Sequence, residues 1–296
     1  MAKHKTAGVG ELLWDMFPEG RQWGGAPGNF ARHCSKLGCS STAISAIGDD
    51  DLGRELVDDA FAAGLECIVP VSDYPTGTVK VTLDDSGVPE YEITENVAWD
   101  HIPLTDDMEA LARYLDAVCF GSLARRSPES RDTIRSLVEQ VREGCLKICD
   151  INLRQHYYSD ELIVDCLEIS NVLKVNDEEL PVVAGACGCG REDMAEAARD
   201  ILSKFSLSRV VVTCGEKGSL MVSPDSVSRC DGYPTEVVDT VGAGDSFSAA
   251  IAVGLLNGLD PEVINDAACR IASYVCSRPG AVPQLPDELV VLLEKK

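Results

Sequence analysis

Short apolar runs alternate with amphipathic helical patterns along most of the 296 residues. The runs expected to be strands are 6–13, 41–46, 117–120, 146–150, 172–175 and 209–213. The patterns expected to be helices are 29–37, 51–63, 106–115, 128–143, 160–169, 177–185 and 192–204. Strands divided by helices are joined by crossovers, which pair the strands in parallel and place helices on both faces of the sheet. The alternation therefore predicts an α/β fold around a mainly parallel central sheet.

Two segments depart from this alternation. Residues 15–24 form an acidic, aromatic, hairpin-like excursion. Residues 76–95 read as two strands, 78–83 and 89–94, joined by Asp84-Asp85-Ser86-Gly87. We expect these segments to form a small sheet beside the carboxyl ends of the parallel strands, where it would serve as a lid. With no internal repeat or low-complexity linker, the sequence predicts one domain over 1–296, with the lid built from about 14–24 and 76–96.

The charge balance argues against several classes of partner. The chain carries 26 Lys and Arg against 49 Asp and Glu, a net charge of −23, which disfavours nucleic acid and anionic membranes as partners. An anionic ligand must then be held locally by backbone amides, a few cationic side chains or a metal. We see no signal-peptide pattern and no apolar run of transmembrane length. The 13 cysteines, an odd number in mostly apolar surroundings, read as reduced thiols in a cytoplasmic protein.

The stretch Asp239-Thr240-Val241-Gly242-Ala243-Gly244-Asp245 follows a β-branched run and opens a helix that ends near Asn257-Gly258. The amides of Gly242, Ala243 and Gly244 at the helix start attract anions, because the unpaired N–H groups and the helix dipole act together. Asp245 suits such a place if it accepts a proton from a hydroxyl that attacks a phosphate, which predicts phosphoryl transfer to an alcohol. Taken alone, the motif fits equally a close strand–helix contact with an acid that complements the dipole.

Three further positions read as ligand contacts or as ordinary structure. Asn29 follows the glycines of Gly24-Gly25-Ala26-Pro27-Gly28 and offers a donor and an acceptor to a polyhydroxyl ligand, or it caps the following helix. Asp15, expected just past the first strand, accepts sugar hydroxyls or serves as a turn residue. Arg154, past the strand 146–150, is placed to reach a transferring phosphate.

Two motifs in the second half of the chain are candidates for binding a nucleotide and its metal ion. Asn176 and Glu179 match a helix capping box, and the same pair suits a Mg²⁺ ion bound through water. Thr213, Gly215 and Gly218 outline a glycine turn suited to nucleotide phosphates, though such turns are common. Residues 219–230 just beyond it read as an antiparallel hairpin.

Together these residues resemble the ribokinase-like (phosphofructokinase-B) family of sugar kinases over nearly the whole chain. The family's C-terminal signature is matched by Asp239–Asp245, and its N-terminal signature by Gly24–Asn29, with Gly38 and Gly48 at the expected spacing. The resemblance implies a three-layer α/β core with a β-sheet lid over the sugar. It also implies that Asp245 is the catalytic base and that the amides of Gly242, Ala243 and Gly244 form the anion hole.

The resemblance assigns ligands to the remaining motifs. ATP would contact Thr213, Gly215, Gly218 and Asn176, with the adenine beside the helix 261–277. Asn176 and Glu179 would act on Mg²⁺, so the resemblance favours the metal over the capping box. The sugar would contact Asp15, Gly25 and Asn29, and a K⁺ ion would use carbonyls near Asp239, Val241 and Gly280. The sequence Arg278-Pro279-Gly280-Ala281 departs from the commoner pattern at that cation site.

Within the family, residues 10–15, 24–29 and 150–154 look most like bacterial fructokinases. The expected activity is ATP-dependent phosphorylation of D-fructose at the 6-hydroxyl, with Arg154 stabilising the transferring group. Ribose is an alternative, although ribokinases usually carry a lysine where this chain has Ala26-Pro27. Arg154 keeps 2-keto-3-deoxygluconate open, because it would bind that substrate's carboxylate. By analogy with the family we expect a homodimer through the lid.

Two other classes of function fit the sequence less well. A non-catalytic sugar- or nucleotide-binding regulator is disfavoured because Asp245, Arg154 and the Asn176/Glu179 pair are all present. A dinucleotide-dependent oxidoreductase needs a glycine fingerprint after the first strand, where this chain has Gly10-Glu11-Leu12.

Overall fold

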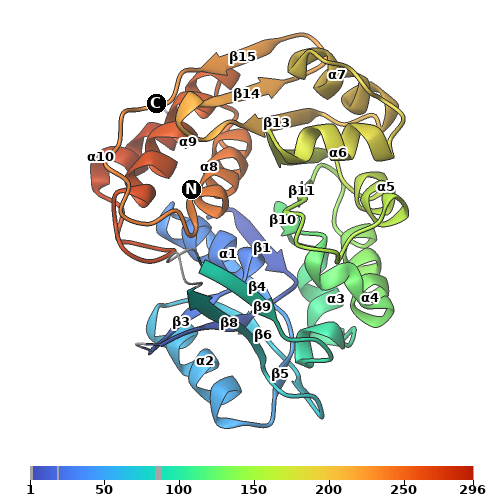
Figure 1. Ribbon diagram of the computed structural model, residues 1–296, viewed down its shortest axis with the longest axis vertical. Coiled ribbons are helices and arrows are strands. Elements are labelled where there is room, and N and C mark those ends of the chain that lie inside the picture. Colours follow the sequence, from blue (N-terminus) through green and yellow to red (C-terminus); the bar gives the residue numbers. More distant parts are fainter. Residues whose placement is uncertain (1–2, 19, 84–88, 296) are drawn as a thin grey trace.

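The computed structural model describes residues 3–18, 20–83 and 89–295 (Figure 1). The described residues form a nine-stranded central sheet in the order β15-β14-β13-β12-β11-β10-β1-β4-β6. Its strands are β1 (Lys5–Val9), β4 (Ser40–Ile44), β6 (Glu66–Ile68), β10 (Ala117–Phe120), β11 (Leu146–Asp150), β12 (Val172–Asn176), β13 (Arg209–Thr213), β14 (Ser219–Val222) and β15 (Val227–Cys230). In this order, the seven neighbouring strands from β13 through β1 to β6 pair in parallel. Strands β14 and β15 form an antiparallel hairpin at one edge. The mainly parallel sheet and the hairpin at 219–230 are confirmed.

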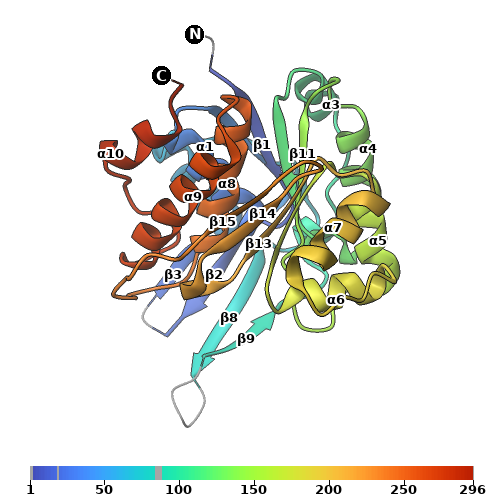
Figure 2. The same cartoon turned by 90° about the horizontal axis from the view of Figure 1, so that it is seen from above.

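Helices cover both faces of this sheet (Figure 2). The α-helices are α1 (Ala26–Lys36), α2 (Asp51–Ala62), α3 (Asp106–Ala112), α4 (Pro128–Glu139), α5 (Asp160–Glu168), α6 (Glu179–Ala186), α7 (Met194–Lys204), α8 (Ala243–Leu256), α9 (Pro261–Cys276) and α10 (Asp287–Val290), and the short 3₁₀ turns are η1 (Ala98–Asp100), η2 (Leu123–Arg126), η3 (Gly215–Lys217) and η4 (Val291–Leu293). Helices α1, α8 and α9 pack on one face, and α3 to α7 on the other. Alternate strand residues enter opposite cores: Val210 and Val212 face α7, while Val211 faces α8 and α9.

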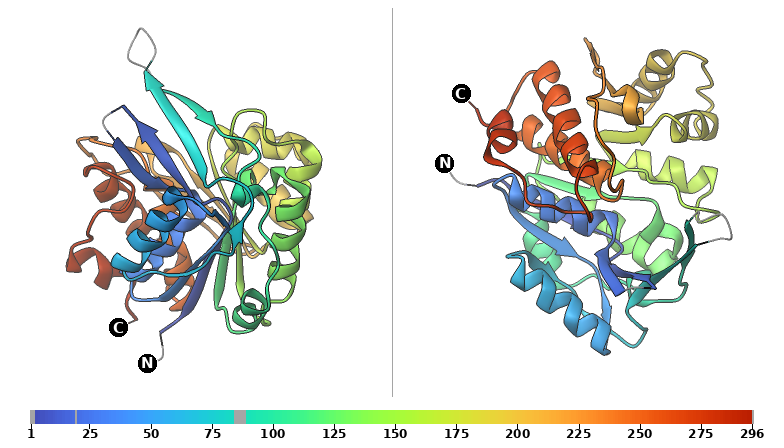
Figure 3. Two further views of the ribbon diagram at one scale, coloured as in Figure 1. Left: turned by 90° about the horizontal axis from the view of Figure 1, so that it is seen from below. Right: turned by 60° about the vertical axis from the view of Figure 1, so that its left-hand side comes forward.

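A second sheet projects from the carboxyl ends of the parallel strands (Figure 3). It consists of β2 (Leu13–Phe17), β3 (Gly20–Gly24), β8 (Gly77–Leu83) and β9 (Pro89–Ile93), in the order β3-β2-β8-β9. A separate pair, β5 (Ile47–Gly48) with β7 (Val71–Ser72), lies near its base. We call the four-stranded sheet the lid. It confirms the predicted α/β architecture of a three-layer core with a small additional sheet. The predicted turn at 84–87 lies outside the described residues.

The first predicted strand is wrong at its end. Residues 6–13 do not continue as one strand, because β1 stops at Val9 and β2 starts at Leu13 in the other sheet. At the break, Gly10 has φ +147, and a Cβ there would lie 2.9 Å from the Pro27 ring. Asp15 consequently lies inside β2 of the lid, opposite Gln22, and not just past a core strand.

Two general expectations can be compared with the described residues. All 13 cysteines carry free thiols. No helix in the part of the chain that the structure describes has the length and apolar character needed to cross a membrane.

Candidate active site

The site forms where the first turn of α1 meets the first turn of α8, below the lid. Gly25, with φ 107, precedes α1, and the helix begins at Ala26, so Asn29 lies within its first turn. The alternative reading of Asn29 as a helix cap is therefore wrong. Its Nδ2 instead donates to Oδ2 of Asp245, 2.9 Å away and 216 residues later in the chain. The two signature motifs thus meet through a hydrogen bond.

The start of α8 is shaped as an anion site. Gly242 has φ 78, and a Cβ on it would lie 2.1 Å from the carbonyl oxygen of Ala281, so this close approach requires glycine. His33, one turn after Asn29 on α1, lies 3.0 Å from the same carbonyl through Nε2. Burial lowers the pKa of His33 to about 4, so the neutral ring donates an N–H there. Helix α1 therefore supports both Asp245 and the segment behind Gly242.

The backbone amides at this helix start have spare donor capacity. Ala243 N donates to Thr240 O over 3.3 Å, a long bond, and the first helical bond is made by Ser246 N to Gly242 O at 2.8 Å. For the N–H groups of Gly242 and Gly244, no acceptor is found among the described residues. An anion at this position would satisfy these donors and the helix dipole together.

The carboxyl of Asp245 has the properties of a general base. Burial, together with the neighbouring charge of Asp150, raises its pKa to about 6. The hydrogen bond from Asn29 and the charges of Lys174 and Arg154 act in the opposite direction. A pKa near 6 leaves the group mostly ionised at pH 7 yet basic enough to accept a hydroxyl proton in a transition state.

Sequence reasoning missed a buried ammonium below the anion site. Lys174 of β12 is 8% exposed, and its Nζ donates to Asp150 Oδ1 at 3.0 Å. The other oxygen of Asp150 accepts from Ser248 Oγ at 2.7 Å. A Cβ on Gly244 would lie 3.0 Å from Lys174 Nζ, so the ammonium adjoins the first turn of α8. Burial alone would lower the pKa of Lys174, but Asp150, Glu179 and Asp245 outweigh it and raise the pKa, so the charge is retained. A lysine inside an apolar strand pattern was the available signal.

Glu11 is a second residue that the sequence reading passed over. It is 3% exposed, and burial raises its pKa to about 7, with Asp245 adding to the rise and Arg154 opposing it. Its Oε2 and the Oδ1 of Asn29 are buried without a hydrogen-bond partner among the described residues. Such atoms normally have one. Two unpaired acceptors beside Asp245 fit a ligand that brings hydroxyl donors.

Asp15 and the glycines of the first motif close around these acceptors. Burial raises the pKa of Asp15 to about 6, and Arg154 opposes the rise. A Cβ on Gly24 would lie 2.4 Å from Asp15 Oδ2, and one on Gly25 would lie 2.3 Å from the Glu11 carbonyl oxygen. The structure therefore brings the predicted residues Asp15, Gly25 and Asn29 to one place, with Glu11 among them.

Arg154 is an exposed cation whose charge acts on these carboxyl groups. It is exposed in the loop between β11 and α5, and its Nη1 donates to Leu153 O at 3.2 Å. Its charge lowers the pKa values of Glu11, Asp15 and Asp245 relative to burial alone. The charge of the predicted cation therefore acts on all three carboxyl groups of the site.

The Asn176/Glu179 motif forms the capping arrangement in full. Asn176 Oδ1 accepts from the amides of Glu178 and Glu179, at 2.9 and 2.7 Å, and Glu179 Oε2 accepts from Asn176 N at 2.9 Å. Glu179 Oε1 accepts from Leu153 N at 2.8 Å. Both lone pairs of Asn176 Oδ1 are used by these amides, whereas each Glu179 oxygen accepts one hydrogen bond and retains a further lone pair. The pair therefore fits an ion held through water, and the described residues contain no cluster of three or more His, Cys, Asp or Glu side chains that would bind one directly.

The predicted nucleotide turn follows β13. Thr213 ends the strand, Gly215 has φ 55 and opens η3, and Gly218 has φ 88. A Cβ on Gly218 would lie 1.9 Å from Cys230 O, which shows how closely the turn packs on the end of β15. The turn and the Asn176 motif both lie at the carboxyl ends of neighbouring parallel strands.

The three residues predicted for a monovalent cation are also joined. Asp239 Oδ1 accepts from Val241 N, and its Oδ2 accepts from Gly280 N, each at 3.0 Å. The carboxylate therefore fixes two loops side by side next to the start of α8. Cation binding by these loops remains a prediction.

Two curated relatives are similar to this chain over almost its whole length. A putative sugar kinase of Pyrococcus horikoshii is 26% identical, with 93% of this chain and 91% of the relative covered. A fructokinase of Salmonella typhimurium is 27% identical, with 94% and 95% covered.

The solved structures agree with this result. The Pyrococcus horikoshii sugar kinase superposes with a TM-score of 0.83 at 25% identity, covering 97% of this chain and 96% of that one. It has also been solved in complex with ATP. The family model described as pfkB family carbohydrate kinase matches residues 19–288, and this match includes both signature motifs. The chain therefore belongs to the pfkB family of carbohydrate kinases, phosphotransferases that act on an alcohol group.

Proposed function

We propose that this kinase transfers the γ-phosphoryl group of ATP to the 6-hydroxyl of D-fructose. The observation that carries the proposal is the hydrogen bond between Asn29 and Asp245. It joins the sugar motif to a basic carboxylate, and that carboxylate stands at a helix start with spare amide donors. A hydroxyl held by Asn29 therefore lies between a base and an anion site, which is the arrangement that phosphoryl transfer requires.

Asp245 accepts the proton of the attacking hydroxyl. As negative charge shifts over the transferring group, the amides of Gly242 and Gly244 donate to it, and the Lys174 ammonium beneath the helix adds positive potential. Arg154 approaches from the solvent side and contributes a charge-assisted contact. The fixed amides and the buried lysine need little reorganisation during the reaction, because the fold already orients them.

A Mg²⁺ ion fits the residues present. The two oxygens of Glu179 have spare lone pairs, and Glu179 lies just beyond the carboxyl end of β12, where Asn176 Nδ2 can donate to a metal-bound water. These residues would hold the ion through water, and when bound it neutralises charge on the nucleotide phosphates. ATP as donor is supported by the ATP complex of the similar Pyrococcus kinase.

The pocket chemistry supports a neutral sugar. Glu11, Asp15 and Asp245 supply acceptors for hydroxyl groups, and Arg154 is the cation that faces them. A substrate carboxylate or phosphate beside three acids would be repelled, whereas a polyol offers donors to each. Fructose is favoured over other neutral sugars by the similarity to the Salmonella typhimurium fructokinase.

The proposal is tested by a coupled assay of ADP release with Mg-ATP. The acceptors are fructose, ribose, tagatose, 2-keto-3-deoxygluconate and fructose 6-phosphate. We expect fructose to give the highest kcat/KM, and Asp245→Asn to lower kcat by about 10²-fold or more. Higher turnover on another sugar would refute fructose but keep the kinase mechanism. Tight sugar binding without ADP release would indicate a regulator instead.

A further inference from the structure

The loop that carries Arg154 is attached on both sides of that residue. On one side, Leu153 N donates to Glu179 Oε1 at 2.8 Å, which fixes the loop to the start of α6. On the other side, Gln155 Nε2 donates to Tyr91 O of the lid at 2.6 Å. Arg154 thus lies between a residue bonded to the Asn176/Glu179 motif and a residue bonded to the lid.

The contact with the lid is regular. Strand β9 is the outer strand of the lid sheet, and within the described ranges it pairs with β8 alone. In an antiparallel pair, residues two apart direct their carbonyls to the same side. Tyr91 and Ile93 are two apart, and they accept from Gln155 and Tyr157, also two apart, with Tyr157 Oη 3.3 Å from Ile93 O. The side chains of the loop therefore take the place of a neighbouring strand along β9.

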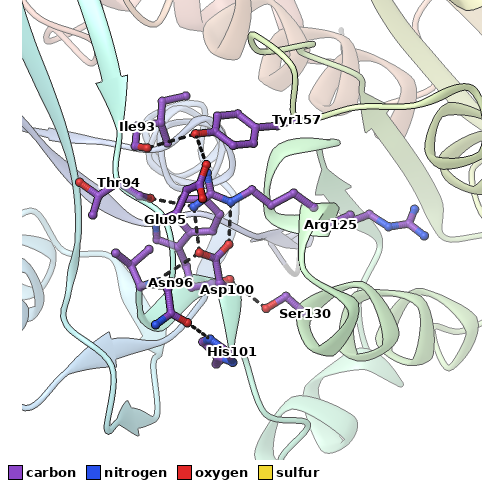
Figure 4. A network of polar contacts seen from close by, with 12 residues as sticks. Ile93, Thr94, Glu95, Asn96, Asp100, His101, Arg125, Ser130 and Tyr157 are labelled. Atoms are coloured by element: carbon purple, nitrogen blue, oxygen red, sulfur yellow. Dashed lines mark hydrogen bonds and ion pairs between the residues drawn. The ribbon is translucent and has the colours of Figure 1, made fainter.

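Tyr157 is itself fixed at the base of the lid (Figure 4). Its hydroxyl also lies 2.9 Å from Glu95 Oε1, so one proton has two acceptors. Its ring covers the guanidinium of Arg126, 4.5 Å from the ring centroid. Arg126 donates to Thr94 O at 2.7 Å and pairs with Asp100 at 2.8 Å. Arg126 therefore contacts both the residue that follows β9 and the Tyr157 ring of the loop.

The backbone of the loop is held in an unfavourable conformation. Gln155 has φ 47, a region that side chains other than Asn, Asp and Gly rarely occupy, whereas Asn152, at φ 44, is of a type that tolerates it. Such a conformation persists where the surroundings impose it. The bonds to Glu179 and to β9 are the contacts on either side of Arg154 that do so.

We propose that Gln155 and Tyr157 are positioning residues that couple the lid to Arg154. They fasten the loop to β9, so that Arg154 reaches the transferring phosphoryl group only while the lid covers the sugar. This inference rests on the proposed role of Arg154 in phosphoryl transfer. The lid and the arginine then move as one unit, and bound ATP has its full set of charges around it only when the acceptor sugar is in place.

The test is a double-mutant cycle on kcat. Gln155→Met and Tyr157→Phe remove the two donors and keep side-chain size, charge and the ring over Arg126. We expect the double variant to lower kcat by about 10-fold, since each lost bond contributes a factor of a few, with the sugar KM changed by less than about 2-fold. In an Arg154→Ala background the same two substitutions should lower kcat by less than about 2-fold, because they act through Arg154.

Tyr158→Phe is the matched control. Tyr158 is the next residue, no hydrogen-bond partner of its hydroxyl is found in the described part of the chain, and its loss should leave kcat unchanged. Tyr157→Phe alone, expected to lower kcat by about 3-fold, keeps the test available if the double variant folds poorly. A full 10-fold loss in both backgrounds would overturn the coupling while leaving the kinase function intact. A wild-type chain without kinase activity on any sugar would remove both proposals together.

Discussion

The hydrogen bond from Asn29 to Asp245 makes a quantitative prediction about pH. A hydrogen bond to a charged group contributes about 1.5–3 kcal/mol, and one pKa unit corresponds to about 1.4 kcal/mol. Asn29 Nδ2 lies 2.9 Å from Asp245 Oδ2 and stabilises the ionised form. Asn29→Leu, which keeps the approximate volume but removes the donor, should therefore raise the pKa of Asp245 by about 1–2 units.

The assay is the pH dependence of kcat/KM for fructose between pH 5 and 9. The acidic limb of this profile reports the essential base of the free enzyme. In the wild type, activity should fall as pH drops through about 6, the pKa of Asp245. In Asn29→Leu the limb should move to about 7–8. The absolute kcat/KM also falls because the sugar loses a contact, but the position of the limb does not depend on that loss.

Two other carboxyls titrate in the same range and serve as controls. The pKa of Asp15 is about 6 and that of Glu11 about 7. If Asp245 is the base, Asp15→Asn should leave the limb where it is, and Glu11→Gln should shift it slightly downward by removing a neighbouring negative charge. A limb that disappears in Asp15→Asn or Glu11→Gln, or one that stays at about 6 in Asn29→Leu, would refute the assignment.

Three further outcomes are expected. Because the pKa of Glu11 is raised from 4.5 to about 7, the native protein binds more protons than the unfolded chain between these values, and stability falls as pH rises through them. Glu11→Gln should remove about 3 kcal/mol of this loss at pH 8 but not at pH 4.5, measured by urea unfolding. Gly242→Ala should lower both Tm and kcat because its Cβ would meet Ala281 O, whereas Gly258→Ala, at φ 66 with nothing within 4 Å, should cost only about 1 kcal/mol and leave kcat unchanged. Chelation of Mg²⁺ should abolish turnover, and Glu179→Gln should raise the Mg²⁺ concentration needed to restore it; equal requirements in both proteins would exclude Glu179 from metal binding.

Local patterns were sufficient to predict the framework of the fold. Apolar runs and amphipathic segments identified the parallel strands and their covering helices, because burial on both faces dictates that composition. The same reading failed at Gly10, where the apolar pattern continues from β1 into β2 although the chain changes sheets. Hydrophobicity does not distinguish two buried strands in sequence from one long strand, and only the Pro27 ring against Gly10 shows why the chain bends there.

The candidate site was predictable only in part, for a related reason. Motifs at helix starts, such as Gly242–Asp245, carry their chemistry in consecutive residues and were recognisable. Lys174 and Glu11 act through burial, which depends on residues distant in sequence. The sequence pattern around Lys174 does not show that Asp150 from the neighbouring strand neutralises it. The sequence left two interpretations of Asn29, a helix cap or a ligand contact, because its hydrogen-bond partner Asp245 is 216 residues away.

The site separates fixed from movable charge, and this separation explains its composition. Lys174 is buried and committed to Asp150, so it supplies the same positive potential whether or not a ligand is bound. Arg154 is exposed and attached to the lid through its neighbour Gln155, so its contribution varies with the position of β9. Three acids with raised pKa values suit a sugar but oppose a nucleotide. An active site of this kind needs an additional cation when phosphate enters. Arg154 is that cation, and its attachment to the lid through Gln155 lets it act when the sugar is already bound.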